Sequence, residues 1–350
     1  MTVVLATTNK STPAGADFMR RDNSLTVRQL MLKYGLSEAL KGDITEFAIN
    51  RPNEFFTESA RGWEVFDDDR LSLQNLEGLA NAIAVFNDKQ LTFENPIVSL
   101  TLPDGERCQI VIPPACENGT ISMTIRKPSS SRFTLENYAD SGRLNPAASG
   151  TSNEIKDWEK ELVKLKNEGE FEEFFRLGVA NRLNFVTVGG TGSGKTTFSK
   201  CLIDLYPRDA RLFTVEDSHE LTTPLHRNSV HLFFSPTLLA KAVLQSCMRM
   251  KPDHIFITEL RGDETWDYLM ALKSGHSGSV TSIHANDCRG ALYKIGSYIK
   301  QSEVGQTLDF HYIMQEVMTT IDVVVFFDKT KMTELYYDPV EKLRLLRGAK

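Results

Sequence analysis

The fold is decided by a glycine-rich stretch in the second half of the chain, Gly189-Gly190-Thr191-Gly192-Ser193-Gly194-Lys195-Thr196. It matches the pattern G-x-x-x-x-G-K-[ST] in full. An apolar segment predicted to be a strand, 184–188, precedes it, and a helix-compatible segment, 196–205, follows it. Glycines allow backbone N–H groups to curl around an anion, and the N-terminus of the helix adds a positive partial charge. The strand, loop and helix together predict a phosphate-binding loop for a nucleoside triphosphate.

The residue types in this loop indicate how the ligand is held. Lys195 is expected to reach the β- and γ-phosphates, and Thr196 is expected to hold Mg²⁺. We expect the nucleotide to be ATP, since the chain has no N-K-x-D signal for reading guanine. The expected nucleotide-binding residues of the loop are Gly189, Gly190, Thr191, Gly192, Ser193, Gly194, Lys195, Thr196 and Thr197.

The chain around this loop, from 153 to 350, alternates strand-like and helix-like segments. Strands are predicted over 184–188, 211–215, 254–258 and 279–283, and helices over 195–205, 237–250 and 264–273. For the helix at 237–250, Ser235 is the predicted N-cap and Pro236 the first helical residue. The alternation predicts an α/β domain with a mainly parallel sheet joined by crossover helices.

The chain before this domain has a different pattern. Residues 1–24 are polar with little periodicity and are expected to form a loose arm, and one helical pattern runs from Leu25 to Leu40. A second helix is predicted over 71–86, and strands over 44–50, 54–58, 63–66, 97–102, 107–112 and 120–126. Residues 25–128 are therefore predicted to form an α+β domain with an antiparallel sheet. The density of Ser, Gly, Pro and Asn in 129–152 predicts a linker.

Composition and charge limit the class of protein. The 350 residues suggest two domains, and 41% hydrophobic with 25% charged residues is ordinary for a globular chain. With 40 Lys and Arg against 46 Asp and Glu, the net charge of −6 argues against general nucleic-acid binding. No apolar run is long enough to span a bilayer, and the N-terminus does not have the pattern of a signal peptide. Five widely spaced cysteines without a CxxC pair indicate neither a disulfide framework nor a zinc site.

Acidic residues follow two of the predicted strands. Strand 211–215 ends in Glu216-Asp217-Ser218-His219-Glu220, and strand 254–258 ends in Glu259-Leu260-Arg261-Gly262. The carboxyl ends of parallel strands form the ligand crevice of an α/β sheet. Glu216 and Glu259 are therefore two candidates for the carboxylate that orients or deprotonates an attacking water, and the residues alone do not rank them.

Four ordered motifs give the chain a resemblance to a known family. They are the phosphate loop, an acidic box over 215–221, the strand end 257–262, and a histidine box from Gly275-His276 to His284-Ala285-Asn286. On these motifs, residues 25–330 resemble the secretion ATPases of type II and type IV secretion systems and type IV pili. The similarity is greatest to the hexameric, conjugation-type member of type IV systems. The chain departs from the family pattern at Thr258, where glycine is usual, and in the length of 129–152.

The resemblance implies a RecA-like P-loop ATPase domain in the second half, with nucleotide between the two domains of a subunit. It implies a ring of six copies that couples ATP binding and hydrolysis to substrate translocation or pilus assembly. It further implies a cytoplasmic, peripheral location at a bacterial inner membrane, inner-membrane and coupling proteins as partners, and a protein or nucleoprotein as cargo. The long linker is compatible with an exchange of domains between neighbouring subunits.

The resemblance also extends to single residues. It implies that Lys195, Glu216, Glu259 and His284 are catalytic, that His276 and Arg261 contact the nucleotide, and that Thr196, Glu216 and Glu259 surround Mg²⁺. His276 and His284 would sense the γ-phosphate or link it to the next subunit.

Two arginines of the first domain are singled out by strand geometry. In 107–112 and 120–126 the apolar residues alternate, which leaves Arg107 and Arg126 on the other, polar face. A hairpin around 113–119 makes them near cross-strand neighbours, where two like charges repel unless an anion lies between them. We therefore expect this pair to clamp the γ-phosphate, as arginines at matching positions do in the family.

Other functions stay open at this point. A type II secretion or type IV pilus motor belongs to the same superfamily, although such motors often carry extra N-terminal domains or a tetracysteine zinc site. A P-loop kinase for a small molecule predicts an arginine-rich lid, and a scaffold gated by nucleotide predicts ATP binding with little turnover. The basic tail 342–347 is expected to form a solvated terminal helix, with membrane or partner contact as the alternative.

Overall fold

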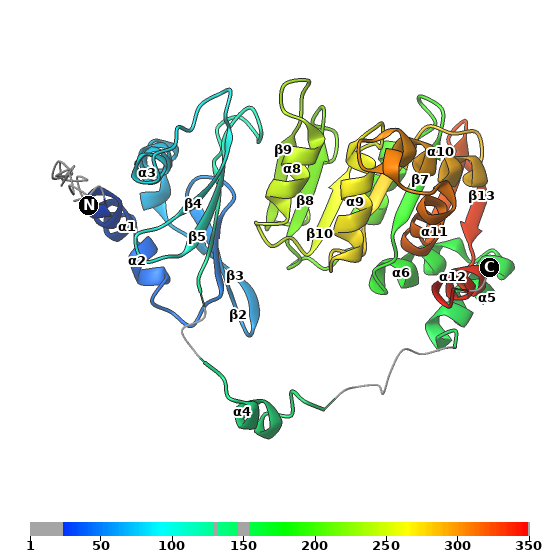
Figure 1. The fold of residues 1–350 in the computed structure, drawn as a ribbon, viewed down its shortest axis with the longest axis horizontal. Helices are drawn as coiled ribbons and strands as arrows, with labels where there is room; N and C mark the ends of the chain where they lie inside the picture. The colour runs from blue at the N-terminus through cyan, green and yellow to red at the C-terminus, as the bar shows by residue number, and fades with distance from the viewer. Residues whose placement is uncertain (1–23, 129–131, 146–153, 349–350) are drawn as a thin grey trace, which may run out of the picture.

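The structure is a computed structural model that describes residues 24–128, 132–145 and 154–348. The expected arm lies outside the described residues apart from Ser24, and so do the parts of the expected linker at 129–131 and 146–152. Figure 1 shows two bodies side by side, one from each half of the chain. A long connection below them carries the short helix α4 (Leu135–Asp140).

The N-terminal body is built on a six-stranded sheet. Its strands are β1 (Glu46–Ile49), β2 (Glu54–Ser59), β3 (Gly62–Asp67), β4 (Ile97–Thr101), β5 (Arg107–Val111) and β6 (Ser122–Arg126). They pair antiparallel in the order β3-β2-β1-β6-β5-β4, which confirms the predicted antiparallel sheet. Its helical elements are α1 (Ser24–Lys33), α2 (Leu36–Ala39), the short 3-10 helix η1 (Asp69–Leu71) and α3 (Leu73–Phe86). Val27, Leu79 and Ile110 are completely buried in the core that these helices share with the sheet.

The single helix predicted from Leu25 to Leu40 is wrong in one respect. Gly35 has a φ of +81° and separates α1 from α2. A left-handed residue cannot continue a right-handed helix, and glycine adopts this conformation without a steric penalty. The break turns the chain so that Leu36 and Leu40 also become buried.

The C-terminal body is an α/β domain. Its strands are β7 (Phe185–Gly189), β8 (Leu212–Glu216), β9 (Ser229–Phe233), β10 (His254–Ile257), β11 (Val280–Ile283), β12 (Val323–Asp328) and β13 (Lys331–Tyr337). They form ladders in the orders β10-β8-β9 and β11-β7-β12-β13, parallel except between β12 and β13. Because β10 also lies beside β11, the two ladders continue one layer. The predicted mainly parallel sheet is confirmed.

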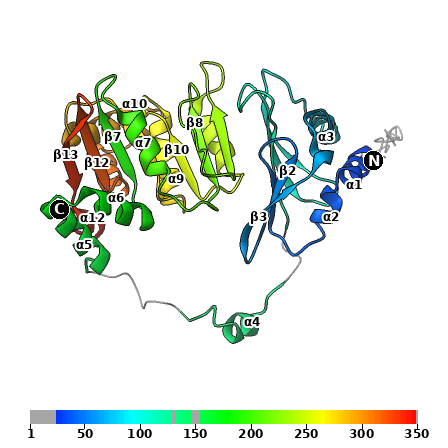
Figure 2. The ribbon, with the colours of Figure 1, turned by 180° about the vertical axis from the view of Figure 1, so that it is seen from behind.

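Helices cover both faces of this layer. Figure 1 shows α8 (Ala240–Cys247), α9 (Glu264–Lys273), α10 (Cys288–Gln301) and α11 (Phe310–Thr320) in front of the strands. Figure 2, seen from behind, shows α6 (Phe171–Ala180) and α7 (Lys195–Ile203) on the opposite face. The short η2 (Gly305–Thr307) follows α10, whereas α5 (Asp157–Glu168) and α12 (Pro339–Leu346) lie near the β13 end. Among the described residues, no helix combines the length and apolar character that crossing a membrane requires.

The predicted start of the helix at 237–250 is wrong. Helix α8 begins at Ala240, and residues 235–238 instead close a turn of their own. The Ser235 hydroxyl accepts a hydrogen bond from the Leu238 amide at 3.2 Å, and the two backbones exchange further bonds. Ser235 therefore caps a turn rather than the helix. Ser and Pro are common both in turns and at the start of a helix, so the sequence could not distinguish the two structures.

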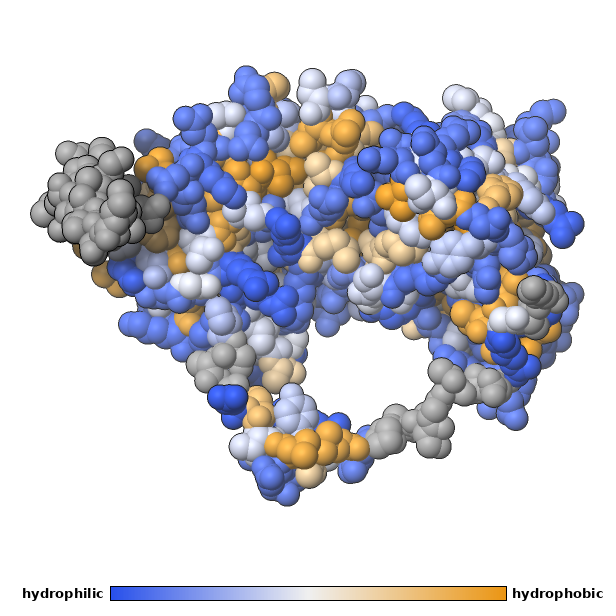
Figure 3. All heavy atoms as spheres, viewed as in Figure 1, coloured by the Kyte–Doolittle hydropathy of each residue, from blue (hydrophilic) through white to orange (hydrophobic). Residues whose placement is uncertain are grey.

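Several elements had no clear signal in the sequence, among them β9 and the helix within the expected linker. Helix α4 begins with a capping box in which the Thr134 hydroxyl accepts from the Asn137 amide at 3.2 Å. It has no buried residue, and the apolar side chains Phe133, Leu135 and Tyr138 are exposed. Figure 3 shows orange, hydrophobic atoms on the connection between the two bodies, where α4 lies.

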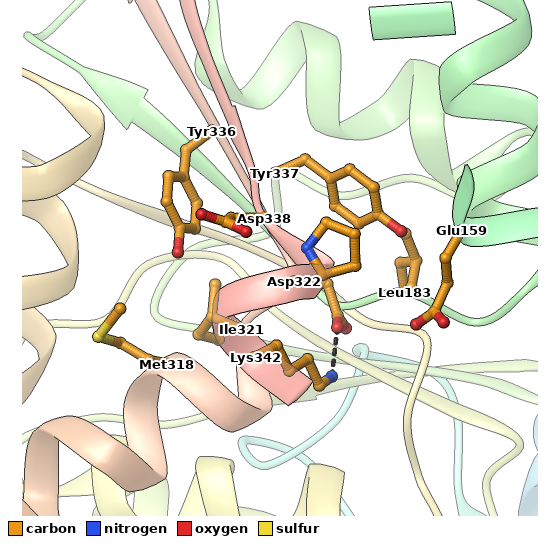
Figure 4. Close-up of a pocket in the computed structure, with 10 residues that line it drawn as sticks. Glu159, Leu183, Met318, Ile321, Asp322, Tyr336, Tyr337, Asp338 and Lys342 are labelled. Carbon is orange, nitrogen blue, oxygen red and sulfur yellow. Dashed lines mark hydrogen bonds and ion pairs between the residues drawn. The ribbon is translucent and has the colours of Figure 1, made fainter. Parts of the chain in front are cut away.

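The basic tail is held on the domain rather than free in solvent. It lies in α12, where Leu345 is buried and its carbonyl accepts from the Gln315 amide group at 3.0 Å. Lys342 forms an ion pair with buried Asp322, which Figure 4 shows across a small pocket. That pocket has a volume of about 10 Å³, which is room for one water at most. It is therefore not a nucleotide site.

A buried arginine connects the two bodies. Arg211, just before β8, is completely buried between the rings of Trp63 and Phe213. Its guanidinium donates to the Asn50 amide oxygen at 2.9 Å and the Thr124 hydroxyl at 3.1 Å, both in the N-terminal body. Burial lowers the pKa of this guanidinium to about 9. The group is thus a polar centre of the contact between the two halves of the chain.

Candidate functional site

The phosphate loop lies between β7 and α7, as predicted. Gly189, Gly192 and Gly194 have φ values of +150°, +74° and +91°, which favour glycine. A Cβ atom on Gly189 would lie 2.5 Å from the Phe327 carbonyl oxygen and from the Ser193 hydroxyl, so the close approach itself requires glycine. The Ser193 hydroxyl is buried without a hydrogen-bond partner among the described residues. An unpaired hydroxyl inside a ring of backbone amides suits an anionic ligand.

Lys195 places its charge against the loop. Its ammonium is buried and donates to the carbonyl oxygens of Gly189 and Gly190, at 2.8 Å in each case. Burial lowers the pKa of Lys195, and the nearby Glu259 carboxylate opposes this shift. The remaining loop residues Gly190, Thr191 and Gly192, and Thr197 in the first turn of α7, are exposed.

Thr196, the expected Mg²⁺ ligand, has an acidic neighbour that sequence reasoning did not single out. Its hydroxyl donates to the Glu220 carboxylate at 3.2 Å. Glu220 stands in the acidic run after β8, so the run was a signal, but its position within the run did not identify this residue. A hydroxyl beside a carboxylate is a donor set that suits Mg²⁺.

Glu216, the sequence candidate in the same run, faces elsewhere. Its carboxylate is completely buried and accepts hydrogen bonds from the Thr214 hydroxyl at 2.6 Å and from the amides of Glu220 and Leu221 at 2.7 and 2.8 Å. Burial alone would raise the pKa of Glu216, but bonds from His231, Thr214 and the two amides outweigh it and lower the pKa. Glu216 therefore stabilises the turn after β8 as an ionised anchor.

Glu259 follows β10 and belongs to a small charged network. It forms an ion pair with Arg261 at 2.9 Å, its Oε1 atom lies 3.4 Å from His284 Nε2, and Arg261 also reaches Asp217 at 2.6 Å. The hydrogen bond from Arg261 to Glu259 raises the pKa of that guanidinium above its ordinary value. Thr258, where the family usually has glycine, donates to the Val215 carbonyl at 3.1 Å. The hydroxyl is thus satisfied by the neighbouring strand, and the substitution leaves the strand end intact.

One pocket brings the phosphate loop and part of the histidine box together. Its volume is about 430 Å³, and Gly189, Gly190, His284 and Lys294 are among its lining residues. Lys294 donates to the His284 carbonyl at 2.6 Å, and its position in α10 gave no signal in the sequence. The pocket size is within the range of small-molecule sites.

Two sets of residues predicted to contact the nucleotide, His276 and the pair Arg107 and Arg126, lie outside this pocket. The Nδ1 atom of His276 lies 3.0 Å from the Pro252 carbonyl oxygen, and among the described residues His276 forms no hydrogen bond with 189–197. Arg107 and Arg126 are direct register partners on β5 and β6, which confirms the predicted hairpin. They line a separate pocket of about 570 Å³ together with Lys89 and Arg249, and the described lining includes no residue of the phosphate loop.

A parallel sheet with this loop at the end of a central strand defines the class of P-loop nucleotide hydrolases. The model of the family described as "Type II/IV secretion system protein" matches residues 152–325. The type IV secretion system protein VirB11 of Brucella abortus is 39% identical over 350 residues, covering 94% of this chain and 96% of that protein. The corresponding protein of Bartonella henselae is 37% identical over 335 residues, covering 89% and 94%.

A solved structure agrees with these relatives. The crystal structure of the VirB11 ATPase from the Brucella suis type IV secretion system, in complex with sulphate, matches with a TM-score of 0.89 and 39% identity. The match covers 93% of this chain and 98% of that one. The chain therefore belongs to the type II/IV secretion system protein family, and it is an ATP-hydrolysing enzyme of a type IV secretion system. Of all the functions considered from the sequence, these relatives support the ATPase of a type IV secretion system.

Proposed function

We propose that ATP binds in the pocket formed by the phosphate loop and His284, with Mg²⁺ beside Thr196. The observation that supports this proposal is that three groups surround the same end of the sheet: buried Lys195, the Thr196–Glu220 pair and the Glu259–His284 pair. When bound, Mg²⁺ supplies charge neutralisation for the β- and γ-phosphate oxygens. Lys195 adds a fixed positive charge, and Thr196 and Glu220 are the residues that hold the ion or its waters. Glu259 remains a further candidate for that shell.

The attacking water has two carboxylate candidates in this proposal, Glu220 and Glu259. Glu216 is not one of them, because its oxygens already accept from Thr214 and from two backbone amides. His284 contacts Glu259 and is suited to respond to charge at the γ-phosphate position. Arg261 and His276 complete the set of residues proposed to act at the nucleotide. Arg261 holds Glu259 and Asp217 in place, and His276 acts from outside the pocket.

Replacing Glu220 tests the position of this carboxylate. We expect Glu220→Gln to lower the rate of phosphate release about 10²- to 10³-fold while ATP binding is retained, because a preorganised charge beside the ion is lost. Phosphate release and fluorescent-nucleotide binding measure the two effects separately.

The matched control is Glu216→Gln. We expect it to lower the melting temperature, because the two N–H groups of Glu220 and Leu221 lose a charged acceptor and the NH2 group of the amide cannot accept the hydrogen bond that the Thr214 hydroxyl donates. The assignment is contradicted if Glu220→Gln hydrolyses ATP normally, or if Glu216→Gln loses hydrolysis while its melting temperature stays unchanged.

We propose that six copies form a ring and that Arg107 and Arg126 of one copy reach the phosphate of another. The separate pocket of these arginines supports this. Within the part of the chain that the structure describes, its four cations form a single ion pair, between Arg126 and buried Glu46, so an anion from elsewhere would balance their charge. The long linker around α4 is consistent with an exchange of domains between neighbours. The ring would act peripherally at the inner membrane on a protein or nucleoprotein cargo, with secretion-system proteins as partners.

Mixing inactive variants tests whether the arginines act between subunits. Arg126→Ala, Arg107→Ala and Lys195→Ala are each expected to lose hydrolysis by at least about tenfold. A mixture of Arg126→Ala and Lys195→Ala chains, assembled together, is expected to regain activity, because some intact loops then face intact arginines. Phosphate release across mixing ratios is the measurement, with oligomeric state followed by light scattering.

Two results would reject this arrangement. Normal hydrolysis by both arginine variants in intact oligomers excludes a phosphate clamp. Inactive single variants without recovery in the mixture place the arginines in the same subunit as the loop that they serve.

A further inference from the structure

Two histidines and a glutamate converge away from the phosphate loop. Glu216 ends β8, His219 lies in the turn that follows, and His231 stands in the middle of β9. One ligand-type atom from each of the three lies within 4.8 Å of the others. Glu216 and His231 are buried, whereas His219 is partly open to solvent with 36% of its side chain exposed. The cluster is thus buried on one side and accessible to an ion on the other.

The two distances from the carboxylate to the imidazole nitrogens are close to the ligand separations of a metal site. The Oε1 atom of Glu216 lies 3.4 Å from His219 Nδ1 and 3.7 Å from His231 Nδ1. Ligands of a tetrahedral Zn²⁺ with bonds of about 2.0–2.1 Å are about 3.3 Å apart. A shift of a few tenths of an ångström brings both nitrogens to that separation from the carboxylate. The two imidazole rings, 4.7 Å apart between centroids, already lie together.

The other nitrogen of each ring has an outer partner. His231 Nε2 is 3.4 Å from the Thr223 hydroxyl, and His219 Nε2 is 3.8 Å from the Glu117 carboxylate. When they are at hydrogen-bond distance, such partners orient metal-bound imidazoles and select the tautomer that ligates through the first nitrogen, and Glu117 would have to move a few tenths of an ångström closer to do so. In the structure, His231 Nδ1 also lies 2.8 Å from the Thr214 hydroxyl. Because the Thr214 hydroxyl donates its own hydrogen to Glu216, the hydrogen atom between the hydroxyl oxygen and the imidazole is carried by His231 Nδ1. A metal ion bound to Nδ1 would replace that proton.

We propose that Glu216, His219 and His231 bind a divalent transition ion of the zinc class, separate from Mg²⁺ at Thr196. The two imidazoles discriminate between the ions, because Zn²⁺ binds imidazole nitrogen readily and Mg²⁺ prefers oxygen ligands, whereas both ions accept the carboxylate. Three protein ligands leave a fourth position for water. The ion would tie β8, β9 and the intervening turn together, and through Glu117 it would also engage the connection between β5 and β6. Since the turn carries Glu220, the metal would hold the carboxylate that contacts Thr196.

Zn²⁺ binding to the full chain, freed of metal by chelation and kept in excess Mg²⁺, is the test. We expect one Zn²⁺ per chain by calorimetry and elemental analysis. With Co²⁺ as the probe, we expect a visible four- or five-coordinate spectrum without a thiolate charge-transfer band, which excludes the free cysteines as ligands. His219→Ala and His231→Ala are expected to weaken binding at least about 100-fold, and Glu117→Gln about tenfold. The exposed His311 provides the matched control His311→Ala, which keeps full binding.

His219→Ala keeps the test decisive if the buried His231 proves necessary for folding. Binding of Zn²⁺ by folded His219→Ala with wild-type affinity would overturn the site. So would a wild-type chain that takes up less than one Zn²⁺ at saturating metal, or a Co²⁺ spectrum with thiolate bands that is lost in Cys201→Ser. Because excess Mg²⁺ occupies the Thr196 position, each of these outcomes is independent of the proposed ATP site.

Discussion

Lys195→Ala is expected to abolish ATP hydrolysis, with phosphate release reduced at least about 10²- to 10³-fold. Its ammonium is the buried positive charge of the phosphate loop, and it contacts the Gly189 and Gly190 carbonyls that form the loop wall. Alanine removes the charge that would neutralise the transferring phosphoryl group. The measurement is steady-state phosphate release with nucleotide binding determined in parallel.

A control on the same helix separates this effect from general damage. Lys200→Ala, five residues further along α7, is expected to retain hydrolysis within a factor of about two. Hydrolysis by Lys195→Ala at the wild-type rate would show that the loop does not carry the reaction. A wild-type chain that binds ATP without releasing phosphate would instead support the nucleotide-gated scaffold.

Arg211→Met is expected to destabilise the protein by about 3–5 kcal/mol, the largest stability effect that we predict for one side chain. Methionine keeps much of the apolar stem, but it leaves the Asn50 oxygen, the Thr124 hydroxyl and the Met250 carbonyl without the donor that Arg211 supplies, whereas the Asn228 oxygen keeps only the bond from the Asn50 amide group. Each buried group left unpaired costs about 1–3 kcal/mol. The variant also removes the cation between Trp63 and Phe213.

Chemical denaturation measures the loss, and limited proteolysis shows whether the two bodies separate first. Arg208→Met, at an exposed position three residues earlier, is the control and should change stability by less than about 0.5 kcal/mol. A loss below about 1 kcal/mol for Arg211→Met would contradict a central role for this arginine in joining the two halves.

Local patterns were sufficient for most of the secondary structure. Helix 264–273 was predicted with the bounds that α9 has, and the strands around the phosphate loop differ from their predictions by a residue or two. Alternation of polar and apolar residues predicted that Arg107 and Arg126 are neighbours, because strand geometry has a period of two. Elements with weak periodicity, such as β9 with two polar residues in five, gave no comparable signal.

The positions of side chains at the ends of strands could not be read in the same way. Glu216 and Glu220 stand four residues apart in one acidic run, yet Glu216 folds inward to hold the turn and Glu220 reaches Thr196. The difference depends on how the turn closes against β9 and α7. Likewise, the widely spaced cysteines did not indicate a zinc site, whereas the pairing of β8 with β9 brings His231 close to Glu216.

The sequence by itself determined the phosphate loop, the α+β and α/β architectures of the two halves and the family, because each depends on short patterns whose backbone geometry is local. The tertiary structure alone decided which carboxylate faces Thr196, that Arg107 and Arg126 line a pocket apart from the loop, and that Glu216, His219 and His231 meet. Those arrangements depend on the order of strands in the sheet and on the packing of the two halves around Arg211. Contacts between residues so distant in the chain are set by burial and hydrogen bonding in the folded state, which no local pattern encodes.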